Sequence, residues 1–441
     1  MTRIIRYGQL IPASHVQDNE PVASKQKGIY TDNKGIVCLQ CGNRDMLYFH
    51  KYISNHQEEI VYCRNCLQLG RVDNMTDYVL IESKRNKTTA SYTLPFNLSD
   101  QQCYASKKMI YAIQHHQKLL LYAVTGAGKT EMMFPGIQYA RHKGYNVAIV
   151  SPRVDVVLEI SQRILDAFQG EQIDVLHQQS RQQFNGHFVI ATIHQLYRFK
   201  NHFDLIFVDE VDAFPLAMES SLFIAIQMAA CRQASIIYMT ATPSKALLAQ
   251  FNHEQIIYLP ARFHRHPLPV PRFKYFKLKC NRQQQTLVRI LQNQLNKRRI
   301  TLVFFHHIET MLAAYHRYQA VLSSLTYVYS EDVLRFEKVE ALRQGNYEIV
   351  FTTTILERGF TMAHLDVIVI DAQTFSKAAL IQIAGRVGRK AHAPDGMVLY
   401  LHQGVSLSMI AARREVQSMN RLAREKGWLD EKMPPMSSTH P

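Results

Sequence analysis

Four cysteines in two CxxC pairs are the clearest ligand set in the first part of the chain. Cys38 and Cys41 form one pair, Cys63 and Cys66 form the other, and 21 residues separate the pairs. Each pair presents two thiolates to one ion, so that two pairs complete a tetrahedral zinc site. Redox pairs and disulfides are the alternatives, although an intracellular chain disfavours disulfides. We therefore predict a structural zinc site, because four sulfurs leave no position open for water.

A phosphate-binding loop is the second group of residues that could do chemistry. Residues 119–130 have the sequence LLLYAVTGAGKT, which indicates a strand, a tight loop and the start of a helix. Gly126 and Gly128 let backbone amides approach phosphate oxygens closely. Lys129 is placed to reach the β- and γ-phosphates, and the Thr130 hydroxyl is placed to bind Mg²⁺. This pattern predicts a site for ATP with magnesium.

Acidic and hydroxyl side chains follow two later apolar runs. Residues 205–212 have the sequence LIFVDEVD, in which Asp209 is placed to hold Mg²⁺ and Glu210 to polarise the attacking water as a general base. An ordinary strand that ends in an acidic loop is the alternative. Further on, Thr240 and Thr242 put two hydroxyls at the end of another predicted strand.

Two arginines near the end of the chain complete the candidate set. Residues 382–389 have the sequence QIAGRVGR, so Arg386 and Arg389 lie three residues apart beside glycines that permit close approach. Such arginines can neutralise charge that develops on a transferred γ-phosphoryl group. A basic loop is the alternative. Their place far from the phosphate loop in sequence predicts that ATP binds between two domains.

Strands must position these groups, and the chain contains short apolar runs in two sets. The first set comprises residues 119–124, 146–150, 188–191, 205–208 and 235–239. The second set comprises residues 300–305, 348–351, 366–370 and 397–401. Runs this apolar are typical of parallel strands covered on both faces, and longer amphipathic stretches separate most of them. The pattern predicts an α/β fold with two parallel-sheet domains in tandem behind a small cysteine module.

Two seams divide the chain into expected segments. Residues 83–90 are polar and poor in strand formers, and residues 260–271 contain four prolines, which exclude a helix or a central strand. The expected segments are an N-terminal extension (1–30), the zinc module (31–82), motor domain 1 (95–260), a proline-rich linker (261–271), motor domain 2 (272–428) and a flexible tail (429–441).

Composition bounds the class of protein. The chain has 441 residues, 47% of them hydrophobic and 20% charged, which excludes a disordered or fibrous protein. No apolar run reaches the roughly 18 residues of a membrane span, and no secretory signal is recognisable, so we expect an intracellular protein. The net charge is +15, and residues 261–299 contain eleven Lys or Arg and no acidic residue. A basic block of this kind fits a nucleic-acid partner, a solvated face or a linker.

The order of these motifs resembles that of superfamily 2 helicases and translocases over roughly residues 95 to 415. Residues 98–102 resemble the motif that reads adenine, residues 151–153 and 191–196 resemble strand-gripping motifs, and residues 352–361 resemble the motif that couples ATP to nucleic acid. The resemblance implies two RecA-like domains. It implies ATP contacts from Gln102, Thr125, Gly126, Ala127, Gly128, Lys129, Thr130 and Gln382. It implies coupling through Thr240, Thr242 and Gly359, with Arg153 and Thr192 as nucleic-acid contacts.

A narrower resemblance is to the ComFA family of late-competence ATPases. It rests on the cysteine module directly ahead of the motor, DEVDAFP at residues 209–215 and SPRVDV at residues 151–156. The resemblance implies a cytoplasmic motor at the inner face of the membrane that pulls single-stranded DNA through an uptake channel. It also implies a small phosphoribosyltransferase-like partner.

Three other functions fit parts of the sequence. An RNA helicase has nearly the same motor and differs in substrate preference. A replication-restart helicase combines zinc and motor, but its cysteines lie within or after the motor in a longer chain. A DNA-binding scaffold with a degenerate nucleotide site is the non-enzymatic alternative, and the intact Lys129, Asp209 and Glu210 argue against it.

Overall fold

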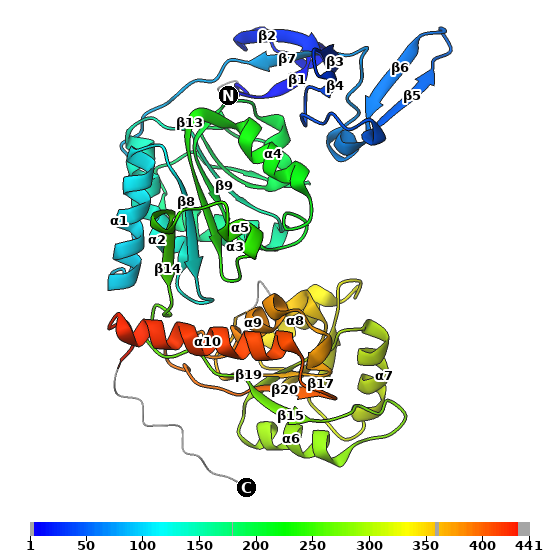
Figure 1. The fold of residues 1–441 in the computed structure, drawn as a ribbon, viewed down its shortest axis with the longest axis vertical. Helices are drawn as coiled ribbons and strands as arrows, with labels where there is room; N and C mark the ends of the chain where they lie inside the picture. The colour runs from blue at the N-terminus through cyan, green and yellow to red at the C-terminus, as the bar shows by residue number, and fades with distance from the viewer. Residues whose placement is uncertain (1–3, 179, 358–360, 431–441) are drawn as a thin grey trace. The chain divides into compact units, whose positions relative to one another are not determined.

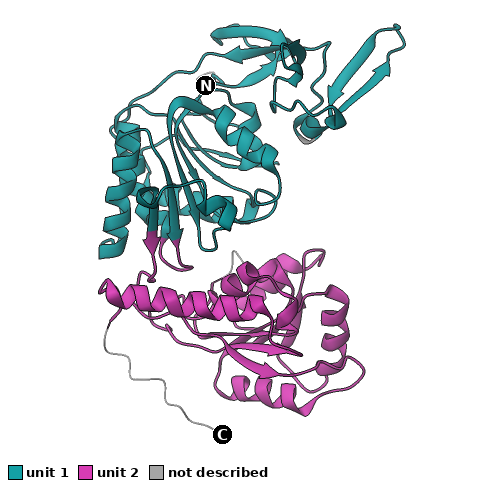
Figure 2. Cartoon of the chain, in the orientation of Figure 1, with its two compact units in different colours: residues 1–122, 129–257 teal, residues 123–128, 258–441 magenta. Residues whose placement is uncertain are grey.

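The computed structural model describes residues 4–178, 180–357 and 361–430. The chain falls into two compact units, coloured teal and magenta in Figure 2. The first unit comprises residues 1–122 and 129–257, and the second comprises residues 123–128 and 258–441. Among the described residues, no helix has the length and apolar character that crossing a bilayer requires.

The N-terminal part of the first unit consists of short antiparallel strands. One sheet has the order β1-β7-β2, and two hairpins, β3-β4 and β5-β6, carry the cysteines. The strands are β1 (Leu10–Pro12), β2 (Val22–Lys27), β3 (Ile29–Asp32), β4 (Gly35–Cys38), β5 (Phe49–Ile53), β6 (Glu59–Cys63) and β7 (Asp77–Ile81). The 3-10 turns are η1 (Ala13–His15), η2 (Met46–Tyr48) and η3 (Arg64–Leu69). The β5-β6 hairpin projects outward from this module (Figure 1).

A seven-stranded sheet forms the rest of the first unit, with the order β10-β11-β9-β12-β13-β8-β14. Its strands are β8 (Lys118–Ala123), β9 (Val147–Ser151), β10 (Asp174–Leu176), β11 (Phe188–Thr192), β12 (Phe203–Val208), β13 (Ala230–Thr240) and β14 (Ile256–Leu259). The strands from β10 to β8 in this order pair in parallel, and β9, β11 and β12 are buried along their whole length. This pairing confirms the predicted parallel sheet, and the complete burial of these three strands fits a sheet that is covered on both faces.

Helices and 3-10 turns connect these strands. The α-helices are α1 (Asp100–Gln114), α2 (Lys129–His142), α3 (Val154–Ala167), α4 (Ser220–Ala229) and α5 (Lys245–Leu248). The 3-10 turns are η4 (Ile193–Arg198) and η5 (His253–Gln255).

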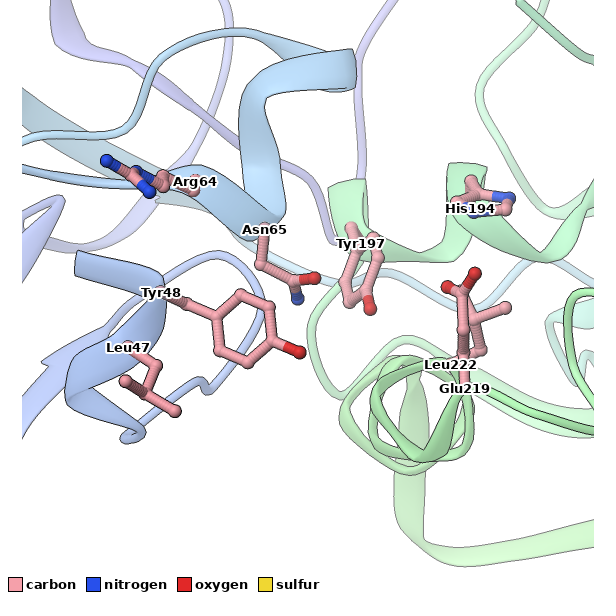
Figure 3. Close-up of a pocket in the computed structure, with 8 residues that line it drawn as sticks. All are labelled: Leu47, Tyr48, Arg64, Asn65, His194, Tyr197, Glu219 and Leu222. Carbon is pink, nitrogen blue, oxygen red and sulfur yellow. The ribbon is translucent and has the colours of Figure 1, made fainter. Parts of the chain in front are cut away.

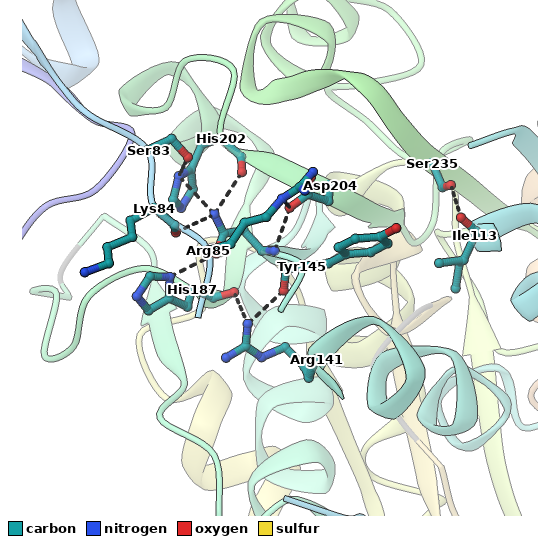
Figure 4. Close-up of polar contacts among 11 residues, drawn as sticks. Ser83, Lys84, Arg85, Ile113, Arg141, Tyr145, His187, His202, Asp204 and Ser235 are labelled. Carbon is teal, nitrogen blue, oxygen red and sulfur yellow. Dashed lines mark hydrogen bonds and ion pairs between the residues drawn. The ribbon is translucent and has the colours of Figure 1, made fainter. Parts of the chain in front are cut away.

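The polar segment at residues 83–90 is anchored to the first sheet (Figure 4). The Arg85 guanidinium donates to the Asp204 carboxylate at 2.5 Å, and the Asn146 side chain donates to the Lys84 carbonyl at 3.1 Å. The Ser83 hydroxyl lies 2.8 Å from Nδ1 of His202. The predicted seam is therefore a fixed connection within one unit.

The cysteine module and the first sheet share one hydrophobic core. Cys38, Cys63, Leu196, Tyr197 and Leu222 all belong to this cluster of buried side chains. A module of this size buries little apolar surface by itself, so packing against the sheet supplies the stabilisation that its own strands lack. The zinc module that the sequence predicts is structurally part of the first unit.

The second unit contains a six-stranded sheet with the order β15-β20-β19-β16-β18-β17, and every neighbouring pair is parallel. Its strands are β15 (Arg272–Tyr275), β16 (Ile300–Phe304), β17 (Leu325–Val328), β18 (Ile349–Thr352), β19 (Leu365–Val369) and β20 (Val398–His402). The connecting elements are α6 (Gln285–Asn296), α7 (Ile308–Tyr318), α8 (Arg335–Arg343), η6 (Thr354–Glu357), η7 (Ala372–Thr374), α9 (Lys377–Ala384) and α10 (Leu407–Glu425).

The apolar runs of the sequence account for the central strands of both sheets. Each of the nine predicted runs overlaps a strand. The short strands β10, β14, β15 and β17 were not predicted. The edge strand β15 lies in the basic block and three of its four residues have exposed side chains, so it lacks the apolar signal that identifies a buried strand.

Candidate metal centre and nucleotide site

The four cysteines meet at the ends of two hairpins. Cys38 is the last residue of β4 and Cys63 the last of β6, and one turn beyond each strand brings Cys41 and Cys66 to the same point. The four sulfurs lie within 4.8 Å of one another, and all four residues are buried. The Cys38 and Cys66 sulfurs are 3.6 Å apart, and those of Cys41 and Cys63 are 3.7 Å apart. Zinc–sulfur bonds of about 2.3 Å place tetrahedral ligands about 3.8 Å apart, so this geometry fits zinc.

Hydrogen bonds within the cluster act in opposite directions on the four thiols, because they raise the pKa of Cys38 and Cys66 and lower the pKa of Cys41 and Cys63. Hydrogen bonds from the neighbouring thiols, above all Cys38, hold the pKa of Cys41 well below its ordinary value. The Asn65 side chain contributes in the same direction. The Lys200 ammonium donates to the carbonyl of Gln40 and, at 3.2 Å, to that of Tyr197. Lys200 therefore connects the first cysteine knuckle to η4 of the sheet domain.

The phosphate loop connects β8 to α2, as the sequence predicts. Gly126 and Gly128 have φ angles of +83° and +75°, which L side chains rarely adopt. The helix begins at Lys129, and its ammonium lies 2.8 Å from Oδ1 of Asp209. Burial opposes the charge on Lys129, but the carboxylates of Asp209 and Glu210 outweigh it and raise the pKa of Lys129. The lysine is thus held as a cation beside the candidate magnesium ligand.

Asp209 and Glu210 directly follow β12, which lies between β9 and β13. The Asp209 amide donates to the Val150 carbonyl at 2.8 Å, which continues the sheet pairing one residue beyond the strand. Glu210 has a φ of +52°, which is unusual for a residue with a side chain. The backbone therefore turns sharply at the predicted general base. Thr130, the second residue of α2, is buried next to the phosphate loop.

The two threonines after β13 contact a carboxylate that sequence reasoning did not single out. The Thr240 hydroxyl donates to Oδ1 of Asp212 at 2.6 Å, and the Thr242 hydroxyl donates to the other oxygen of the same carboxylate. Asp212 is the last residue of the DEVD sequence, so this signal was present in the motif itself. The contacts connect the candidate coupling residues to the segment that holds Asp209 and Glu210.

Of the remaining candidates in the first unit, Gln102 and Arg153 have local partners. The Gln102 side-chain oxygen accepts hydrogen bonds from the Ser99 amide at 2.9 Å and hydroxyl at 3.1 Å, within the capping box of α1. Arg153 donates two hydrogen bonds to the Asp155 carboxylate, at 3.1 and 2.9 Å. Thr192 is buried at the end of β11. Contacts of Gln102 with adenine and of Arg153 and Thr192 with nucleic acid remain predictions.

In the second unit, the arginine motif lies at the end of α9. Gln382 is buried in that helix, and Arg386 is only 1% exposed. The Arg389 guanidinium donates to the Gly385 carbonyl at 2.8 Å. The Thr125 hydroxyl, which belongs to the same unit, donates to this carbonyl at 3.4 Å. The coupling residue Gly359 lies outside the described residues.

Arg262 is a buried arginine whose role the sequence did not reveal. Its guanidinium donates to the Thr125 carbonyl at 3.3 Å and to the carbonyls of Val387 and Gly388 at 2.6 and 2.5 Å. Burial, with a smaller contribution from Arg389, lowers the pKa of Arg262 to about 9, so it stays protonated at neutral pH. The basic block made it indistinguishable from its ten neighbouring Lys and Arg residues.

Three family models match successive parts of the chain. They are the ComFA N-terminal domain of competence proteins at residues 11–80, the Type III restriction enzyme res subunit at 95–245 and the helicase conserved C-terminal domain at 282–391. The chain resembles solved structures of S. cerevisiae Dbp5 bound to RNA and ADP BeF3 (TM-score 0.52, 12% identity, 73% of this chain and 92% of that one). It also resembles RecG bound to a three-way DNA junction (TM-score 0.53, 16% identity, 77% and 48%). At these identities, the likeness concerns the fold alone.

Two parallel sheets with these two helicase domains define a superfamily 2 helicase-type ATPase, the class whose hydrolysis depends on nucleic acid. Two curated relatives are more specific. The chain is 37% identical to competence protein ComFA of Bacillus subtilis (strain 168) over 410 residues, which are 90% of this chain and 88% of the relative. It is 32% identical to competence protein ComFA of Streptococcus pneumoniae (strain ATCC BAA-255 / R6) over 430 residues, 94% and 98% of the two chains. The chain therefore belongs to the ComFA family of competence proteins.

Proposed function

We propose that this protein is an ATPase stimulated by single-stranded DNA that moves along one strand and thereby draws transforming DNA into the cell. The observation that carries the proposal is the ion pair between Lys129 and Asp209 beside Glu210. A phosphate-binding cation, a metal-binding carboxylate and a candidate base are close together in a single unit. A scaffold with a degenerate site has no need to keep these three groups together.

Each of these side chains has one role in the proposed hydrolysis of ATP. Thr130 and Asp209 are the residues that would hold magnesium, which when bound offsets the charge of the phosphates. Lys129 exchanges its contact with Asp209 for the β- and γ-phosphates of ATP. Glu210 accepts a proton from the attacking water. The oxygen of that water bonds to the γ-phosphorus while the bond between the γ-phosphorus and the bridging oxygen breaks, and ADP leaves. Arg386 and Arg389 neutralise the charge that develops on the transferred group.

Movement along DNA requires a grip that changes with the nucleotide state. Thr240 and Thr242 contact Asp212, three residues after Asp209, so a change at the phosphates reaches the end of β13 directly. Arg153 lies two residues after β9, and Thr192 is the last residue of the neighbouring strand β11. In our proposal both contact phosphates of the bound DNA strand. A grip on phosphates is largely independent of base sequence, as import of arbitrary DNA requires.

The cellular role and the partners come from the family. We propose that the protein acts at the inner face of the membrane beside the uptake channel, with a phosphoribosyltransferase-like competence protein as its partner. Both relatives that the chain matches over most of their length are named competence proteins.

Steady-state ATP hydrolysis with different nucleic acids tests the proposal. Rates are measured without nucleic acid and with single-stranded DNA, duplex DNA and single-stranded RNA, with the Lys129→Ala variant as the blank. We expect single-stranded DNA to raise the rate of ATP hydrolysis at least tenfold, and we expect no such increase with duplex DNA or RNA. Stimulation by RNA instead of DNA would show that RNA is the substrate of the motor. A wild-type rate equal to that of Lys129→Ala would show that the protein does not hydrolyse ATP under these conditions and would overturn the proposal.

A further inference from the structure

A cavity of about 380 Å³ lies between the cysteine module and the first sheet, within the first unit (Figure 3). We call it the junction pocket. Its volume falls in the range of pockets that hold small ligands. Eight residues line it: Leu47 and Tyr48 of η2, Arg64 and Asn65 of η3, His194 and Tyr197 of η4, and Glu219 and Leu222 at the start of α4. None of the four cysteines and none of the residues predicted to bind ATP lines this cavity.

The position of η4 connects the pocket to the proposed path of the DNA. The turn begins at Ile193, directly after Thr192, and lies within the segment that resembles a strand-gripping motif. Side chains three residues apart are eclipsed in a 3-10 helix, so His194 and Tyr197 project to the same side. Both point into the pocket in Figure 3. Thr192 is 7% exposed and directly precedes this turn, so a nucleic-acid strand bound at Thr192 would lie close to the turn that lines the pocket.

The outer wall of the pocket suits a flat, apolar ring. Tyr48 is 48% exposed, and Leu47 beside it is 81% exposed. Arg64 lies on the same wall, and its guanidinium is 3.0 Å from Nδ1 of His50. Within the described part of the chain, no carboxylate forms an ion pair with Arg64. Exposed aromatic rings combined with arginine are the surfaces on which unpaired bases stack.

The inner wall supplies uncharged hydrogen-bonding groups. Burial lowers the pKa of His194 and so favours the neutral imidazole, which offers both a donor and an acceptor. Burial raises the pKa of Tyr197 to about 12, so its hydroxyl stays protonated. The Asn65 amide adds a donor and an acceptor. Glu219 adds a carboxylate, which accepts hydrogen bonds from N–H groups and repels phosphate.

We propose that the junction pocket receives one unpaired base of the nucleic-acid strand, stacked on Tyr48, while the phosphates remain outside beside Arg64. This inference rests on the proposed function, because it needs a single strand at Thr192. The pocket offers flat apolar contact at its rim and hydrogen-bonding groups in its interior, and an unpaired base has a flat face and hydrogen-bonding edges that match both. The cysteine module thereby becomes part of the DNA-binding surface of the motor.

Binding of DNA with and without bases tests this proposal. The affinity of the full-length protein is measured by fluorescence anisotropy for a 20-nucleotide single strand of mixed sequence and for a strand of the same length made of abasic sites. The variants are Tyr48→Ala, Tyr48→Phe and, as a matched control, Tyr111→Ala. Tyr111 lies on α1 with 53% of its side chain exposed, close to the value for Tyr48. Zinc content checks that the cysteine module of each variant is folded.

We expect Tyr48→Ala to weaken binding of the normal strand about tenfold, since the base that enters the pocket loses the ring on which it stacks. Tyr48→Phe should restore the affinity, because stacking needs the ring and not the hydroxyl. Tyr111→Ala should bind as the wild type does. On the abasic strand, the wild type and Tyr48→Ala should bind equally, because no base is present to enter the pocket.

Two results would overturn the inference while leaving the proposed function intact. One is an unchanged affinity of Tyr48→Ala for the normal strand when the wild type is stimulated by single-stranded DNA. The other is an equal loss of affinity of Tyr48→Ala for the normal and the abasic strand. That result would show that Tyr48 contacts the DNA backbone or is needed for folding. A wild type that neither binds nor responds to single-stranded DNA would overturn the proposed function and this inference together.

Discussion

The cysteine cluster and the phosphate loop are built in different ways. All four cysteines belong to one unit, and their sulfurs are already at the spacing that a tetrahedral ion requires. The groups predicted to act on ATP are divided: Lys129 and Asp209 belong to the first unit, whereas residues 123–128 and Arg386 belong to the second. A site complete within one unit suits a permanent structural ion. The residues predicted to bind ATP act on a substrate that is bound and released in every cycle, so they need no permanent assembly of this kind.

The phosphate-loop side of this comparison gives the largest expected effect. Lys129→Ala should reduce ATP hydrolysis to the level of the assay background, because the cation that contacts the β- and γ-phosphates is lost. Glu210→Gln should bind ATP with near wild-type affinity and hydrolyse it about 10²–10⁴-fold more slowly, as for loss of a general base. Turnover and binding of a fluorescent ATP analogue are the measurements. Neither variant should lose zinc. Wild-type turnover in either variant would contradict the role that we propose for that residue in ATP hydrolysis.

Substitution of a zinc-binding cysteine should lower the stability of the first unit, because the zinc ion is structural. Cys38→Ser should lose the roughly one zinc ion per chain and lower the unfolding temperature of the first unit by about 10 °C or more. The cluster shares its core with the first sheet, so the whole unit should be affected. Elemental analysis and calorimetry are the measurements.

The single tryptophan provides the internal control for Cys38→Ser. Trp428 lies in the second unit, where it packs against Ala261 and Leu429. Its fluorescence should therefore report an unchanged transition in this variant. A wild-type protein purified without chelators that contains no metal would contradict the zinc assignment, and unchanged calorimetry would contradict the shared core.

Mild acid should weaken the anchoring of residues 83–90 to the first sheet. His202 and His187 are buried in the network of Figure 4, and burial lowers the pKa of each to about 4 from 6.5. Between these values the unfolded chain binds more protons than the folded one, so stability falls as the pH drops from 6.5 to 4. The loss is on the order of 3 kcal/mol per imidazole at most. Urea titrations followed by circular dichroism at several pH values are the measurement.

A histidine variant separates this effect from general acid denaturation. His202→Gln retains groups that can hydrogen-bond to Ser83 and to the Gly186 carbonyl but cannot titrate. Its stability should vary less with pH between 6.5 and 4 than that of the wild type. An identical slope in both proteins would show that His202 does not carry the effect.

The smallest effect concerns Arg262, which connects the phosphate loop to the arginine motif within the second unit. Arg262→Ala should lower the stability of that unit by about 1–3 kcal/mol, since it leaves buried carbonyls without donors. Trp428 fluorescence during urea unfolding is the measurement. The matched control is Arg265→Ala, which removes an exposed ion pair with Asp430 and should cost well under 1 kcal/mol. Equal losses in the two variants would contradict the role of Arg262.

Local sequence determined much of the architecture. The apolar runs identified the central strands of both sheets, because parallel strands buried on both faces are apolar at nearly every position. The CxxC spacing identified the ligand set, because each knuckle is formed by a few consecutive residues. The same holds for Gly126 and Gly128, whose positive φ angles serve a turn that is local to the loop.

Only the tertiary structure decided how distant segments meet. No local signal distinguishes Arg262 from the rest of a basic block, or relates Tyr48 to His194, because burial and proximity depend on packing between segments far apart in the chain. The anchoring of residues 83–90 and the core shared by the cysteines and the first sheet have the same origin. Residue type and spacing therefore fixed the chemistry available to this protein, and long-range packing decided which side chains share a site.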